Sequence, residues 1–140
     1  MNDDTRLARR HLRFGWYALA VFALLGVGLE LAHAYKLGFY LDVGSEMRRL
    51  MMRLGHAHGT LLALVNIGFG CSLPLLGDGG DARLRRSSAS LLVAAVLIPL
   101  GFLLGGAFAS ESDPGVLVAL VPAGAVLFVF GAASAARSVR

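Results

Sequence analysis

The chain has little charge and almost no cysteine, and both absences limit what it can be. Only 16% of its 140 residues are charged, whereas 56% are hydrophobic, and the mean hydropathy is +0.69. This composition is too apolar for a soluble domain of such length and predicts an integral membrane protein. Cys71 is the only cysteine, which excludes an intrachain disulfide, and its place in an apolar run favours a buried packing role. We find no nucleophile triad, no Walker or dinucleotide-binding pattern and no internal repeat.

Four runs without a charged residue divide the chain. They extend over residues 14–29, 54–77, 87–110 and 114–136. A helix needs about 20 apolar residues to cross the hydrocarbon, and the first run reaches this length with its apolar continuation through residue 34. The sequence therefore predicts one domain, an all-α integral membrane four-helix bundle in a lipid bilayer. We expect its helices at about residues 14–36, 54–76, 87–109 and 115–136.

The first run also has the layout of a secretory signal peptide. Four arginines precede its apolar core, and Ala32-His33-Ala34 has the small residues of a cleavage site. Cleavage there would remove Glu30 and His33 from the mature protein. We interpret the run as a signal anchor that forms the first helix.

The basic residues predict the orientation, because cytoplasmic flanks carry the excess of lysine and arginine. With both termini inside, the inner flanks hold nine basic residues: Arg6, Arg9, Arg10, Arg13, Arg83, Arg85, Arg86, Arg137 and Arg140. The outer flanks hold four: Lys36, Arg48, Arg49 and Arg53. We expect both termini in the cytoplasm, in a multi-pass protein of a bacterial inner membrane. The sequence pI near 10 then reports topology, and no nucleic-acid partner is indicated.

Polar residues gather at the predicted outer surface. Glu30 and His33 end the first apolar run, and His56 and His58 begin the second. Ionisable side chains in a membrane span are costly and usually mark a functional site. The fourth histidine, His11, lies among the inner arginines, and we expect it at the surface.

Spacing limits how these side chains can share a ligand. Glu30 and His33 are three residues apart, so they project from one helical face, as a carboxylate and an imidazole do in bundle metal sites. His56 and His58 are two apart, which places them about 200° apart around a continuous helix. Either the helix begins after His58 and both bind one metal, or it begins earlier and each serves a different centre. Gly55 permits a bend, and Gly59 permits the close approach of a flat group or a helix.

The segment from Gly55 to Leu64, GHAHGTLLAL, resembles the His-x-His helix of the haem–copper oxidase and nitric oxide reductase superfamily. In that superfamily the two histidines point to opposite sides and ligate two haems. The resemblance implies that His56 and His58 are haem ligands and that His33 could be the opposite axial ligand of a haem b. The chain is much shorter than those catalytic subunits, and it has no further His-His pair for a copper centre.

Haem also has physical support, since a porphyrin needs an apolar slot, axial imidazoles and cations for its propionates. Those cations would be Lys36, Arg48, Arg49 and Arg53. Room would come from small residues: Gly26, Gly28, Gly68, Gly70, Gly105 and Gly106. We therefore predict a haem b-binding protein or redox-complex subunit in electron transfer, with Glu30 orienting an imidazole.

Two other interpretations remain open. A copper or zinc protein for metal handling could use His33, His56, His58 and Glu30 as ligands, with Met47, Met51 and Met52 nearby. A structural subunit of a larger membrane complex would use its histidines only for hydrogen bonds. The pair Gly101 and Gly105 predicts close helix contacts or a homo-oligomer, and mid-span Asn66 predicts an interhelical hydrogen bond.

Overall fold

The computed structural model describes residues 3–41, 46–76, 82–110 and 113–139 and confirms the all-α fold. Its long helices are α1 (Asp3–Ala34), α3 (Glu46–Ser72), α4 (Ala82–Ala107) and α5 (Leu120–Ala136). Three short helical segments lie between them: α2 (Gly38–Leu41), η2 (Leu73–Leu75) and η3 (Val116–Ala119). Four helical stretches are long and apolar enough to cross a membrane, as expected for a multi-pass membrane protein.

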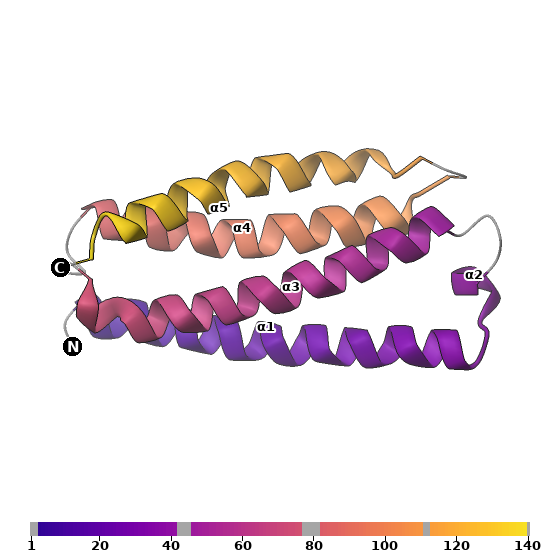
Figure 1. The fold of residues 1–140 in the computed structure, drawn as a ribbon, viewed down its shortest axis with the longest axis horizontal. Coiled ribbons are helices and arrows are strands. Elements are labelled where there is room, and N and C mark those ends of the chain that lie inside the picture. The colour runs from indigo at the N-terminus through magenta and orange to yellow at the C-terminus, as the bar shows by residue number, and fades with distance from the viewer. Residues whose placement is uncertain (1–2, 42–45, 77–81, 111–112, 140) are drawn as a thin grey trace.

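The four long helices lie side by side in the order α1, α3, α4, α5 (Figure 1). Each packs mainly on its neighbours in this order, and α1 meets α4 only slightly. Both termini lie at one end of the bundle, which we call the terminal end, and α2 lies at the other (Figure 1). Because α1 and α5 are at the edges, most of their apolar surface points outward, and Tyr17, Leu24 and Val126 are each about 70% exposed. In a membrane these faces contact lipid.

Small residues let the helices approach closely. Phe22 of α1 lies directly over Gly59 of α3, so the flat group expected at this glycine is a phenyl ring of the neighbouring helix. A Cβ on Gly101 of α4 would lie 2.8 Å from a methyl carbon of Val121. Gly105 faces η3 in the same way, so this Gly-xxx-Gly pair packs within the chain.

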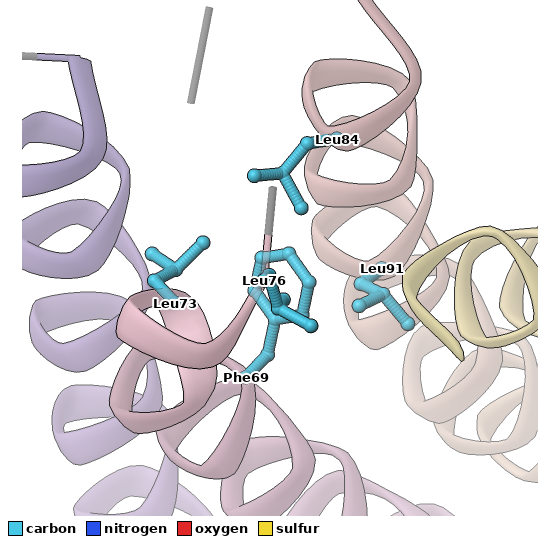
Figure 2. Close-up of a cluster of buried hydrophobic side chains, with 5 residues drawn as sticks. All are labelled: Phe69, Leu73, Leu76, Leu84 and Leu91. Carbon is cyan, nitrogen blue, oxygen red and sulfur yellow. The ribbon is translucent and has the colours of Figure 1, made fainter. Parts of the chain in front are cut away.

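The terminal end of the bundle is closed by an apolar cluster. It consists of Phe69, Leu73, Leu76, Leu84 and Leu91, all buried. Figure 2 shows these side chains gathered between the end of α3 and the beginning of α4. The cluster holds the α3 and α4 ends together and fixes their antiparallel pairing.

His11 lies in the interior beside this cluster, so the prediction of a surface residue was wrong. Its side chain has no exposed area, its Nδ1 is 2.8 Å from Oδ1 of Asn66, and its Nε2 is 2.8 Å from Oγ of Ser88. The reason is that α1 begins at Asp3, well before the apolar run, and places His11 one turn from buried Gly15 on the face that meets α3. The contact confirms the interhelical hydrogen bond predicted for Asn66.

Cys71 is exposed on the surface of α3, contrary to the expectation of a buried packing role. A membrane protein can leave an apolar side chain on its lipid-facing surface, so the apolarity of the run did not determine burial. Three of the long helices, α1, α3 and α4, begin before their uncharged runs, because the charged residues that precede those runs continue the helix. Helix α5 instead begins at Leu120, inside the fourth run and after η3.

Candidate cofactor site

Helix α3 is continuous through both histidines of the His-x-His segment. Of the two alternatives left open by the sequence, the helix therefore begins earlier, at Glu46. His56 contacts α1, whereas the ring of His58 lies against Phe102 of α4 with centroids 4.8 Å apart. Gly55 makes no bend here, and a Cβ at this position would lie 2.7 Å from the Leu103 side chain of α4. The two imidazoles therefore cannot ligate the same ion.

The imidazole of His56 is held by a backbone group of α1. Its Nδ1 is 2.8 Å from the carbonyl oxygen of Phe22. A carbonyl oxygen only accepts hydrogen bonds, so Nδ1 is the donor, and in the neutral imidazole the lone pair is then on Nε2. This is the arrangement in which ligating histidines are commonly held, with one nitrogen bonded to a carbonyl and the other directed at the metal.

Nε2 of His56 is accessible. It has no hydrogen-bond partner among the described residues. In those residues every fully buried side-chain nitrogen or oxygen has a partner, so the unpaired Nε2 is not fully buried. Gly26 of α1 makes room for the ring, because a Cβ there would lie 2.5 Å from Cε1 of His56. The position, tautomer and accessibility of this imidazole all suit a ligand.

His58 has the same tautomer but a different environment. Its Nδ1 donates to the carbonyl oxygen of Leu54, one turn earlier in its own helix, at 2.9 Å. The half-buried ring packs on Phe102 and does not line the pocket occupied by the other polar residues. His58 is therefore separated from the remaining predicted ligands.

A pocket of about 850 Å³ lies between α1 and α3, towards the end opposite to the termini. We call it the histidine pocket. Its polar lining residues are Glu30, His33, Tyr40, Arg49, Arg53 and His56, and the rest of its lining is apolar apart from backbone. The structure thus brings together five of the residues predicted for the site, and it leaves three outside: Lys36, Arg48 and His58.

The end of α1 fixes the position of His33. The amide of Leu37 donates to the carbonyl of Ala32 at 3.0 Å, and the amide of Lys36 donates to the carbonyl of His33 at 3.1 Å. Lys36 has a φ of 51°, so this pair of bonds is a Schellman motif with a lysine where glycine is usual. The motif ends the helix just after His33 and leaves its exposed imidazole at the mouth of the pocket.

Two of the predicted propionate partners are attached to α2. Arg48 donates through Nη1 to the carbonyl of Phe39 at 3.0 Å, and Arg49 donates to that of Tyr40 at 3.1 Å. Arg49 also lies 3.7 Å from Oε1 of Glu46. These bonds hold α2 against α3 and place Tyr40, which is only 4% exposed, in the pocket wall. The sequence analysis missed Tyr40, although a cluster of aromatic residues between two spans was visible at residues 35–40.

The glycines predicted to make room for a porphyrin have mixed surroundings. Gly26 alone among them lines the histidine pocket. Gly70, Gly105 and Gly106 are filled by side chains of neighbouring helices, whereas Gly28 and Gly68 have nothing within 4 Å of a Cβ position. Of the six glycines, three therefore serve helix packing and two have open space beside them, so only Gly26 makes room in the pocket.

No group of three or more histidine, cysteine, aspartate or glutamate side chains in the described ranges is arranged to hold a metal ion. Glu30, His33 and His56 line the same pocket, but their side chains are not arranged to hold one metal ion together. Comparison with protein-family models, with curated proteins and with solved structures found no match for the chain.

Proposed function

We propose that this membrane protein binds haem b in the histidine pocket and takes part in electron transfer. The observation that carries the proposal is His56, whose Nδ1 is bonded to the carbonyl of Phe22 while Nε2 stays accessible beside the pocket. A histidine with this pattern has one nitrogen fixed and one available for iron.

The remaining pocket residues fit the same group. The pocket volume of about 850 Å³ lies within the usual range for bound organic ligands, roughly 300–1,000 Å³. Its apolar lining suits the porphyrin faces, and Arg49 and Arg53 supply positive charge for propionates at the mouth. His33 is available as a second axial ligand, and Glu30, one turn away on the same helix, would orient its ring.

The geometry supports haem better than a bare copper or zinc ion. A structural or catalytic zinc site needs three or four protein ligands, and the described residues offer no such cluster. Haem iron is already held by four porphyrin nitrogens and needs only one or two axial side chains. Bound haem would supply a one-electron couple, and the chain's part is to provide axial imidazoles, an apolar wall and cations near the propionates.

The opposite orientation of His56 and His58 on one helix is the feature that supports the resemblance to the haem–copper oxidase superfamily. We assign haem to His56 and not to His58, because His58 packs on Phe102 outside the pocket. We further propose that the histidine pocket faces the outer side of a bacterial inner membrane, because the terminal end carries the larger number of arginines. At that surface the haem could exchange electrons with a partner subunit or an oligomer of this chain.

An optical spectrum of the detergent-purified protein, oxidised and then reduced with dithionite, tests the proposal. We expect a Soret band that sharpens on reduction, with resolved alpha and beta bands. His56→Ala should lose most of the bound haem. His58→Ala, the matched control two residues away and outside the pocket, should retain it. Haem content that is equal in the wild type and in His56→Ala would refute the assignment.

Elemental analysis of the same sample separates the other two interpretations. A colourless protein with stoichiometric copper or zinc would favour metal handling, and one with neither haem nor metal after reconstitution would favour a structural subunit.

A further inference from the structure

A second polar pocket lies at the terminal end, far from the histidine pocket and between the beginning of α4 and the end of α5. Its volume is about 410 Å³, and its lining residues are Arg83, Arg86, Phe130, Ser134 and Arg137. We call it the arginine pocket. It brings together three guanidinium groups from two helices that are far apart in the sequence.

Two of the three charges in the arginine pocket, those of Arg86 and Arg137, have no carboxylate partner in the described part of the chain. Neither Arg86 nor Arg137 forms an ion pair with any residue that the structure describes, and the first turn of α4 has no acidic side chain. The like charges of Arg86 and Arg137 repel one another across one small pocket, and an anion bound between them would reduce this repulsion. Arginine is well suited to the task because its planar guanidinium binds phosphate oxygens in pairs.

The wall of the pocket is a packed helix interface. Oγ of Ser87 donates to the carbonyl of Gly131 at 2.7 Å, which ties α4 to α5 directly beside the pocket. A Cβ on Gly131 would lie 3.0 Å from Leu91, so the two helices are close together here. Ser134, a polar residue that is only 6% exposed, lies one turn from Gly131 in the pocket wall. The three exposed arginines therefore surround a concavity whose wall is packed.

One side of the arginine pocket is apolar. Phe130 is 49% exposed and lies one helical turn from Ser134, on the side towards the middle of the span. Val126, one further turn along α5, is 70% exposed. An anionic headgroup among the arginines would thus have an outward-facing apolar strip directly below it. A phospholipid has these two parts, whereas a soluble phosphate would make no use of the strip.

From this arrangement we propose that the arginine pocket binds the phosphate group of an anionic phospholipid, with an acyl chain along Phe130 and α5. Basic pockets between membrane helices are a known way of recognising such headgroups. The site is independent of the histidine pocket and does not depend on haem.

Binding of fluorescent phosphatidylglycerol to the purified full-length protein in neutral detergent, compared with fluorescent phosphatidylcholine, tests the proposal. We expect a clear preference for phosphatidylglycerol. The double variant Arg86→Gln/Arg137→Gln should bind phosphatidylglycerol about 30-fold more weakly, from about 1 kcal/mol for each arginine. The double variant Arg9→Gln/Arg13→Gln makes the same change in net charge at the same end of the bundle, and it should bind almost as well as the wild type.

Further variants distinguish the source of the phosphate. Phe130→Ala should weaken lipid binding, and inorganic phosphate at millimolar concentration should compete poorly. Efficient competition by inorganic phosphate would overturn the lipid assignment in favour of a soluble anion. Equal losses in the two arginine double variants would show only diffuse attraction and would also overturn it. Arg86→Lys/Arg137→Lys preserves the charge, and its partial retention of binding would exclude misfolding as the cause of the loss.

Discussion

The histidines of this chain differ in which ring nitrogens are bonded. In His11 both nitrogens are bonded to buried side chains, to Asn66 on one side and to Ser88 on the other. Asn66 uses its amide nitrogen to donate to the carbonyl of Leu62, so its Oδ1 accepts from His11 and the hydroxyl of Ser88 donates to Nε2. His11 therefore has no nitrogen left for a ligand and links three helices. His56 and His58 each have one bonded nitrogen, and of these two only His56 lines the histidine pocket to which we assign the haem.

The contact between Gly26 and His56 gives a prediction at the same scale. Gly26→Ala should remove most of the bound haem, because the added Cβ would collide with the imidazole and move Nε2. Helix propensity alone would favour alanine by about 1 kcal/mol, so the protein should remain folded. Haem content per protein and thermal unfolding would be measured together.

Gly28→Ala is the matched control for this substitution, since a Cβ at Gly28 has nothing within 4 Å. It should keep the haem and unfold at an equal or higher temperature. If Gly26→Ala retained a wild-type spectrum, the ring of His56 would not be held where the proposal requires it.

The uncharged runs located the four long helices well, because a membrane span requires about 20 apolar residues and leaves few alternatives. They did not give the helix ends. Charged residues such as those at the beginning of α1 form helix as readily as apolar ones, so the apolar run marks the membrane and not the helix. The short helix α2 was missed for a related reason. It is held by Arg48 and Arg49, whose bonds to α2 carbonyls have no signal in the local sequence.

The end of α1 provides a prediction for a whole element. Lys36 adopts a left-handed conformation that costs a non-glycine residue roughly 1 kcal/mol, so Lys36→Gly should stabilise the protein by about that amount. Lys36→Ala removes the same charge without relieving the backbone and should give no such gain. Thermal unfolding in one detergent would compare the three proteins. A fall in stability with glycine would mean that the lysine side chain contributes more than its backbone conformation costs.

At the scale of the whole molecule, the sequence predicted which residues lie at the same end of neighbouring helices, but it predicted less well which of them contact one another. Antiparallel helices with a short connection had to bring Glu30 and His33 near His56, and the structure places all three in one pocket. Helix rotation then decided the rest. The two-residue spacing predicted that His56 and His58 point apart on a continuous helix. It did not predict that His58 is the one that faces α4, or that Arg48 bonds to the backbone of α2. The arrangement of the four long helices in a row could not be predicted from the sequence either, because lipid-facing and protein-facing apolar surfaces have similar composition.

Orientation in the membrane is the property of the whole molecule on which both proposed sites depend. The termini lie at one end together with eight of the twelve basic residues that the structure describes, and the histidine pocket lies towards the other end. The positive-inside rule therefore predicts a cytoplasmic arginine pocket and an outward-facing histidine pocket. Green fluorescent protein fused after Arg140 should fluoresce, because this reporter becomes fluorescent in the cytoplasm but not when it is exported unfolded. Alkaline phosphatase fused after Pro114 should be active, because this reporter is active on the outer side of the membrane. The reverse pattern would place the histidine pocket on the cytoplasmic side, and its electron partner would then have to be sought there.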